Sequence, residues 1–179
     1  MADIFSKAKR SDVMSRIRSR GNAATELALV RVFRTQGMTG WRRHLEVRVP
    51  VGKAGTAGKA VRPFRVRPDF VFPRLRLALF VDGCFWHGCP QHGTKPRGNA
   101  AFWRKKFAAN RARDLRVTRM LRRHGWRVLR IWEHELKWPK ARRETVPVSK
   151  AETRLLGRLR RAGLPPRRRG GGERVRGQS

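Results

Sequence analysis

The sequence has few acidic residues and few cysteines, and these two shortages exclude several classes of protein. Of 179 residues, 12 are Asp or Glu and 45 are Lys or Arg, which gives a formal net charge of +33. A field of this sign repels basic partners and attracts a polyanion, of which nucleic acid is the first candidate. The 2 cysteines cannot form the disulfide framework of a small secreted protein.

The sequence also has no long apolar run. Its most apolar stretch, residues 77–81 with their neighbours, is far too short to span a bilayer. The opening residues MADIFSKAKR contain no apolar signal region. We therefore expect a cytoplasmic protein that does not enter a membrane, with enough hydrophobic residues (39%) for one core.

Hydrophobic periodicity predicts a single mixed α/β domain over residues 21–163. The expected order is helix, three strands, helix, strand, helix. Residues 1–20 form a basic N-terminal arm, and residues 164–179 form an Arg/Gly-rich tail with too little apolar surface to order itself. Helices are predicted at residues 25–36, 100–123 and 152–161, strands at 44–49, 69–72, 74–81 and 126–132, and a flexible loop at 49–63.

Two of these helices have a predicted inner side. In the first it carries Leu27, Leu29, Val30 and Phe33, and in the second it carries Trp103, Phe107, Leu115 and Leu121.

Two of the few acids lie at strand ends, beside apolar residues. Asp69 opens one predicted strand, and Asp82 ends the next. A hairpin between these strands would bring both carboxylates to one end of the sheet. They would repel a polyanion unless a divalent cation lay between them, and Mg²⁺ prefers carboxylates combined with phosphate oxygens and water. The alternative is local: Asp69 caps a turn, and Asp82 precedes a glycine turn.

The next segment gathers further ligand groups. Cys84, Cys89 and His92 have a C-x4-C-x2-H spacing that suits a tetrahedral zinc site. The fourth ligand must come from elsewhere, with His44, His87, His124 and His134 as candidates. The alternative is two unrelated thiols beside an incidental histidine. If zinc holds this loop, His87 lies near the two aspartates, where a neutral imidazole can take a proton from water.

Longer motifs carry a family resemblance. They are RPDFVFPRLRLALFVDGCFWHGCPQH, then N-x2-FW-x2-K-x3-N-x2-RD, then GWRVLRIWEHEL, preceded by KAKRSDVMSRIRSRGNAATELAL near the N-terminus. Over about residues 5–138 the sequence resembles the very-short-patch mismatch repair endonucleases. These bacterial enzymes nick DNA beside a T:G mismatch left by deamination of 5-methylcytosine.

The resemblance implies a fold and a catalytic site. The fold is a restriction-endonuclease-like core, helix–strand–strand–strand–helix–strand around a mixed sheet, with a structural zinc site. Asp69 would hold the catalytic Mg²⁺ with the backbone carbonyl of Val81, and His87 would be the general base. Asp82 and Glu26 would be further active-site groups. The acid-x-Lys pattern of related nucleases is missing, because Gly83 and Cys84 follow Asp82.

The resemblance also assigns the zinc ligands and the residues that enter DNA. Structural Zn²⁺ would be held by Cys84, Cys89, His92 and His134. Phe85, Trp86 and Trp103 would wedge into the duplex beside the mismatch, although Trp103 alone also suits a core position on its helix.

The expected partner is double-stranded DNA with a T:G mismatch, bound by a monomer associated with the bacterial nucleoid, together with other mismatch-repair proteins. Two alternatives remain open: a zinc-stabilised DNA-binding protein without catalysis, and a nuclease of this fold with another DNA target. Residues 50–66 are longer than the short turn expected before the Pro-Asp motif. The tail is expected to add non-specific phosphate affinity.

Overall fold

The computed structural model describes residues 25–51, 62–94, 96, 98–136 and 150–164. The predicted N-terminal arm, nearly all of the predicted tail and most of the predicted 49–63 loop lie outside the described residues.

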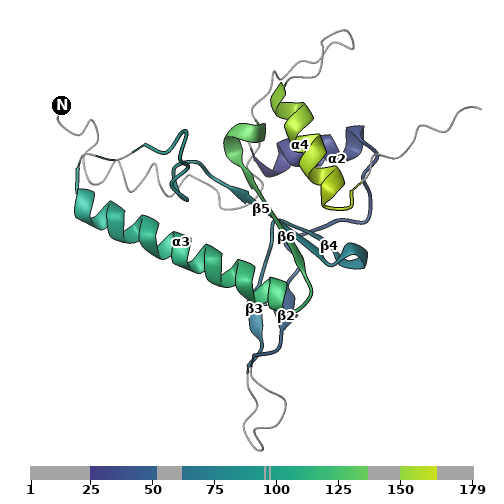
Figure 1. Cartoon of the computed structure of the whole chain (residues 1–179), viewed down its shortest axis with the longest axis horizontal. Helices are drawn as coiled ribbons and strands as arrows, with labels where there is room; N and C mark the ends of the chain where they lie inside the picture. Colours follow the sequence, from purple (N-terminus) through teal and green to yellow (C-terminus); the bar gives the residue numbers. More distant parts are fainter. Residues whose placement is uncertain (1–24, 52–61, 95, 97, 137–149, 165–179) are drawn as a thin grey trace, which may run out of the picture.

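A four-stranded mixed sheet forms the centre of the fold (Figure 1). Its order is β1 (Arg42–Arg43), β4 (Phe70–Phe72), β5 (Leu77–Asp82), β6 (Arg127–Trp132). The β1–β4 and β4–β5 pairs are antiparallel, whereas β5 and β6 are parallel. This mixed sheet confirms the expected α/β class and is consistent with a restriction-endonuclease-like fold.

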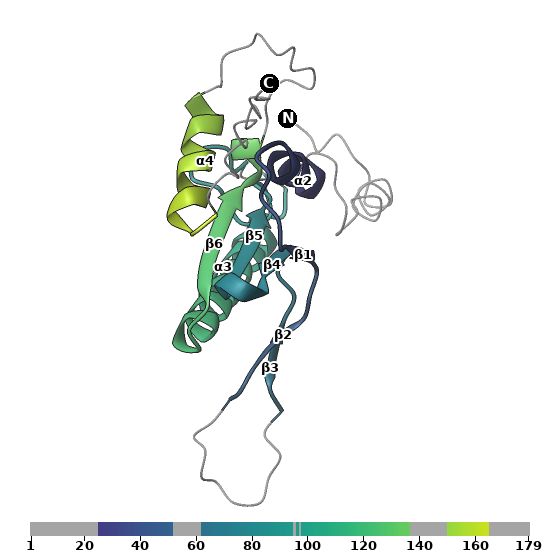
Figure 2. The ribbon, with the colours of Figure 1, turned by 90° about the vertical axis from the view of Figure 1, so that its right-hand side faces the viewer.

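Helices cover both faces of this sheet. Helices α2 (Glu26–Thr35) and α4 (Lys150–Arg161) pack on one face, and α3 (Ala100–Arg123) packs on the other (Figures 1 and 2). Short 3-10 turns, η1 (Pro73–Leu75) and η2 (Glu133–Leu136), follow β4 and β6. No helix in these described ranges is both long and apolar enough to cross a membrane.

Alternate residues of the strands enter two separate cores. On β5, Leu77 and Leu79 lie in the core beneath α2 and α4, whereas Ala78 lies with Leu121 of α3. A sheet buried on both faces needs a nearly continuous apolar run. This explains why LALFV in β5 lacks the polar alternation of a half-exposed strand.

The predicted strand at residues 44–49 is wrong in its extent. Residues 47–49 form β2 (Val47–Val49), which pairs antiparallel with β3 (Phe64–Val66) in a separate two-stranded sheet. No strand was predicted at β3. Its three residues are too short for a clear period, and Pro63 before it resembles loop sequence.

The inner side predicted for α3 is wrong at Leu115, which is 56% exposed. The residues of α3 that enter the core are Val117, Met120 and Leu121. At about 100° per residue, Leu115 lies about 200° around the helix from Val117 and faces away from the sheet.

Candidate active site

The loop after β5 is folded tightly by its own backbone. The Cys89 amide donates to the Cys84 carbonyl over 2.9 Å, and the Gly93 amide donates to the Cys89 carbonyl over 2.8 Å. A Cβ on Gly93 would lie 2.5 Å from that Cys89 oxygen, so only glycine fits there without a shift of the backbone. The turn brings two cysteines that are five residues apart to the same point.

The two cysteines meet two histidines at this point. The Sγ atoms of Cys84 and Cys89 lie 3.3 and 3.6 Å from Nδ1 of His134, which comes from η2. The rings of His92 and His134 have centroids 4.4 Å apart, and all four ligand atoms lie within 4.8 Å of one another. The structure therefore brings together the four residues that the resemblance implied.

The donor set and its spacing fit zinc. Two sulfurs and two imidazole nitrogens are a common structural zinc set, with Zn–S near 2.3 Å and Zn–N near 2.0–2.1 Å. Tetrahedral geometry with these bond lengths places S and N about 3.6 Å apart, close to both observed distances. The alternative fourth ligand His124 is engaged elsewhere, with its Nδ1 2.8 Å from the Met120 carbonyl.

Burial raises the pKa of the Cys84 thiol, and neighbouring Cys89 adds to this effect, although a hydrogen bond from His134 opposes it. A bound cation has the opposite influence, because coordination favours the thiolate.

A second group lies where α2 approaches the start of β4. Glu26, His44 and Asp69 each offer a ligand atom, and these atoms all lie within 4.8 Å of one another. Glu26 is buried and accepts a hydrogen bond from Arg43 over 2.5 Å. His44 Nε2 lies 2.9 Å from Glu26 Oε2. Within the described part of the chain this close contact does not have the geometry of a hydrogen bond, so Glu26 and His44 are placed as two donors that could share one ligand.

Asp69 is fixed between this group and the end of β5. Its Oδ2 accepts a 2.7 Å hydrogen bond from the Val81 amide. Burial raises the pKa of Asp69, the hydrogen bond from Val81 opposes this, and the nearby charges of Glu26 and Asp82 raise it further. A cation beside Asp69 would offset these unfavourable contributions. The donors of the group, carboxylate oxygens with one imidazole, suit a divalent metal ion.

A third group surrounds His87. The Nδ1 atom of His87 lies 2.6 Å from Asp114 Oδ2 on α3 and 3.7 Å from Asp82 Oδ1 at the end of β5. These three residues also offer ligand atoms within 4.8 Å of one another. The short Asp114 contact fixes the imidazole through Nδ1, which leaves Nε2 to exchange a proton with a substrate.

Arg130 on β6 joins the carboxylates of this group. Its guanidinium donates to both oxygens of Asp82 over 2.7 and 2.6 Å and lies 3.0 Å from Asp114 Oδ1. Burial lowers the pKa of Arg130, but Asp82 and Asp114 together outweigh this effect and raise it. The positive charge that pairs with Asp82 is therefore the guanidinium of Arg130.

The four predicted catalytic acids and bases thus fall into two adjoining groups. Asp69 and Glu26 lie in one, and Asp82 and His87 lie in the other. No local pattern assigns a role to Asp114, although it is the last residue of the N-x2-RD motif. In the sequence, His44 is a candidate only for the fourth zinc ligand, and nothing distinguishes Arg130 from the many other arginines.

The three predicted intercalating aromatics pack against one another. The centroid of the Phe85 ring lies 5.1 Å from the ring centroids of both Trp86 and Trp103, and 5.6 Å from that of Phe107. Trp103 and Phe107 belong to α3, while the other two belong to the loop. Asn110 of α3 donates to the Trp86 carbonyl over 2.8 Å. The aromatic cluster therefore fixes the loop against α3, immediately beside His87.

Comparison with known proteins gives the family. A family model described as DNA mismatch endonuclease Vsr matches residues 59–92. DNA mismatch endonuclease Vsr of Escherichia coli is 35% identical over 138 residues, covering 76% of this chain and 77% of the relative. The type II nicking enzyme V.NmeAIP of Neisseria meningitidis is 34% identical over 139 residues, covering 76% and 86%.

Other relatives match more strongly over a shorter segment. The type II nicking enzyme V.NaeI of Lentzea aerocolonigenes is 51% identical over 71 residues, which cover 40% of this chain. This match and two similar ones span about half the length of those relatives, 43–52%. Because the longer matches cover most of the chain, the protein belongs to the family of DNA mismatch endonuclease Vsr.

Proposed function

We propose that this chain is a Mg²⁺-dependent endonuclease that nicks one DNA strand on the 5′ side of the T in a T:G mismatch. The observation that carries the proposal is the meeting of two groups where β4 and β5 adjoin. One is a cluster of possible metal ligands, and the other is a histidine fixed by a carboxylate. A protein that only binds DNA gains nothing from acids placed beside phosphate.

In this proposal Asp69 and the backbone carbonyl of Val81 hold the metal, with Glu26 beside them. Bound Mg²⁺ supplies Lewis-acid stabilisation of charge on the scissile phosphate. The hydrogen bond from the Val81 amide to Asp69 supports this role, because it fixes one carboxylate oxygen and leaves the other for a ligand.

His87 is the general base. Since Nδ1 faces Asp114 at 2.6 Å, the Nε2 lone pair is the one that accepts the proton of the attacking water. Asp114 fixes the tautomer and the orientation of the ring, as a carboxylate does for the histidine of a catalytic triad. Asp82, held by Arg130, supports this arrangement from the sheet.

We also propose that Cys84, Cys89, His92 and His134 bind one structural Zn²⁺. The ion would join the loop to η2 and so fix the segment that carries His87. Phe85, Trp86 and Trp103 act as the wedge at the mismatch. Opening a base step costs about a few kcal/mol, least where pairing is already poor, so a wedge favours mismatched DNA.

The proposed setting is the bacterial cytoplasm, with the protein on the nucleoid as a monomer beside other mismatch-repair proteins. A single nick needs only one active site, which favours the monomer.

The test is a nicking assay on two duplexes that differ in one base pair, T:G or C:G, within the same CT(A/T)GG context. Each is assayed with and without Mg²⁺, using the wild type, Asp69→Asn, and Glu152→Gln on α4 as a matched control. We expect a single Mg²⁺-dependent nick 5′ to the mismatched T, lost in Asp69→Asn and retained in Glu152→Gln, while Asp69→Asn still binds DNA.

Cleavage of both duplexes would keep the nuclease and reject the mismatch specificity. Tight binding without cleavage, with Mg²⁺ or Mn²⁺, would favour the zinc-stabilised DNA-binding protein. Mg²⁺-dependent nicking by Asp69→Asn would refute the role of Asp69.

A further inference from the structure

The two-stranded ribbon of β2 and β3 presents a row of exposed arginines. Arg48, in the middle of β2, and Arg65, in the middle of β3, lie directly opposite each other in the antiparallel register. Both side chains are exposed, as are Arg62 and Arg67 at either end of β3. Like charges directly opposite on a ribbon destabilise it, so this pairing needs a reason beyond folding.

One acid is present on this surface, and it orders the arginines without neutralising them. Glu46 accepts a hydrogen bond from Arg48 over 2.7 Å and another from Arg67 over 3.3 Å. The hydrogen bond from Arg48 is the main reason that the pKa of Glu46 is lowered, so the carboxylate stays ionised at neutral pH. Four arginines against one glutamate leave three positive charges. The Arg48 side chain remains 62% exposed, with donors left for another acceptor.

The other face of the ribbon is packed against the body of the protein. Val47 and Val49 are buried in the core that contains Leu121 of α3. The guanidinium of Arg116, also on α3, lies over the Phe64 ring at 5.6 Å from its centroid. The strands that carry the arginines are therefore held in place by packing on their other face.

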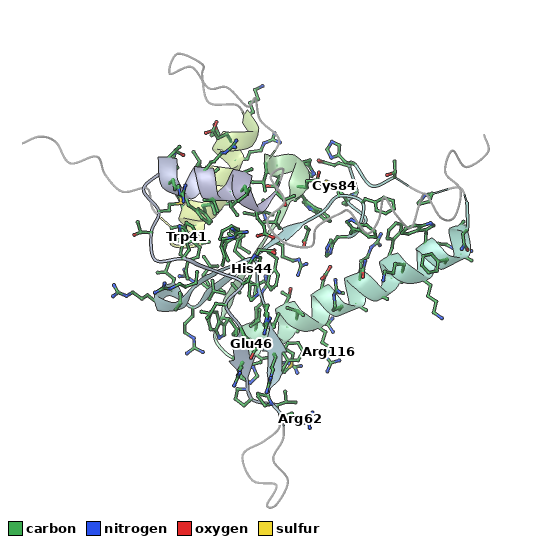
Figure 3. The ribbon with its side chains drawn as sticks, turned by 180° about the vertical axis from the view of Figure 1, so that it is seen from behind. Trp41, His44, Glu46, Arg62, Cys84 and Arg116 are labelled. Atoms are coloured by element: carbon green, nitrogen blue, oxygen red, sulfur yellow. The ribbon has the colours of Figure 1, made fainter. Side chains whose placement is uncertain are left out.

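The ribbon begins beside the proposed metal group and leads away from it. His44 belongs to that group, and β2 starts three residues later. Figure 3 shows His44, Glu46 and Arg62 in succession, with Arg116 beside them, and Figure 2 shows the ribbon extending from the body. Arg48 comes four residues after His44, so at no more than about 3.3 Å per residue the two lie within about 13 Å of each other along the chain. Each strand of a DNA duplex carries a phosphate about every 3.4 Å along the duplex axis.

We propose that the Arg48–Arg65 surface binds phosphates of the DNA duplex within about four base pairs of the scissile bond, as a clamp on one flank of the substrate. The inference rests on the proposed function, because it takes duplex DNA as the ligand. It adds a binding surface outside the catalytic groups and the aromatic cluster. It also assigns a function to Arg65 in residues 50–66, the segment that is longer than the short turn expected before the Pro-Asp motif.

The test uses the double variant Arg48→Gln/Arg65→Gln in the full chain, with Arg31→Gln/Arg34→Gln on the exposed side of α2 as a control that removes the same charge. Affinity for a T:G duplex is measured by fluorescence anisotropy without Mg²⁺, over a range of salt. Each phosphate contact contributes about 0.9 to the slope of log K against log salt. The ribbon variant should therefore lower the slope by about 1.8 and weaken binding between tenfold and about 60-fold at 0.1 M salt.

A second arm locates the contact by shortening the duplex on one flank at a time. For wild type and control, one of the two truncations should weaken binding about as much as the ribbon variant does. For the ribbon variant that same truncation should have little further effect. Circular dichroism of each variant checks folding, and Arg62→Gln/Arg67→Gln provides a second variant on the same surface.

Equal losses in ribbon and control variants, or additive losses from truncation and mutation, would overturn the inference. Failure of the proposed function is distinguishable from this, because it appears as DNA binding without a Mg²⁺-dependent nick, and the flank experiment reads binding alone. If the wild type binds no DNA at all, both proposals fail.

Discussion

Removing the guanidinium of Arg130 is the sharpest perturbation of the candidate active site. Three contacts of 2.6 to 3.0 Å join this side chain to Asp82 and Asp114, and its guanidinium lies 4.9 Å from the centroid of the Phe80 ring. In Arg130→Gln the carboxylates of Asp82 and Asp114 remain close together, and His87 is the third member of their group. The formal charge of the group changes from −1 to −2 when His87 is neutral.

The expected loss of stability follows from the burial of this network. Removing one partner of a buried ion pair costs about 3–5 kcal/mol, because the other charge is left without compensation. The Arg130 side chain is 23% exposed, so water weakens the electrostatic interaction and reduces the expected loss of stability. We therefore expect about 3 kcal/mol, a large fraction of the roughly 5–15 kcal/mol that stabilises a typical domain.

Urea unfolding of wild type, Arg130→Gln, Asp82→Asn and the double variant measures this effect as a cycle. Asp82→Asn should recover part of the stability in the Arg130→Gln background, with a coupling energy of about 1–3 kcal/mol. Arg122→Gln on exposed α3 surface is the control and should change the free energy of unfolding by less than about 0.5 kcal/mol. A loss in Arg130→Gln no greater than in this control, or no coupling to Asp82, would refute the reasoning.

Four further outcomes are expected. Asp114→Asn should lower kcat for nicking about 10²–10⁴-fold with little change in DNA affinity; unchanged kcat would contradict the role of His87. Elemental analysis should find about one zinc per wild-type chain and much less in Cys89→Ser, and a full equivalent in that variant would exclude the four-ligand site. Because burial raises the pKa of Asp69, its ionised form opposes folding above the folded-state pKa, and this penalty disappears as pH falls below the ordinary aspartate range. Without added Mg²⁺, Asp69→Asn should thus have a higher Tm than wild type at pH 8 and an equal one near pH 3, and a gap that does not close would contradict this. Trp86→Ala should reduce the preference for T:G over matched duplex, measured by competition binding, and unchanged preference would reject the wedge.

The sequence predicts well where the signals are local. Helix α3 begins and ends where its periodicity indicates, at Ala100 and Arg123. The Cys84, Cys89 and His92 spacing lies within one loop, so the group could be anticipated from the chain alone. His134 is distant in sequence, and only the resemblance selected it from the other histidines.

The contacts that complete the site were beyond prediction for a physical reason. Asp114 reaches His87 because α3 crosses one face of the sheet, and Arg130 reaches Asp82 because β5 and β6 are parallel with Asp82 opposite Trp132. Neither the crossing nor the register follows from a single helix or strand pattern. The ribbon was missed because β3 is short and its partner β2 lies on the far side of a long connection.

The order of the site residues along the chain has a consequence for synthesis. Three of the side chains that help to orient His87 come well after it in the chain: Asp114, then Arg130, then His134 through the proposed zinc. A chain still emerging from the ribosome therefore carries the base and the candidate metal ligands Glu26 and Asp69 before these three later residues can help to hold the base in place. On this proposal, nicking becomes possible only after β6 and η2 have been made, so unfinished or prematurely terminated copies cannot cut the genome.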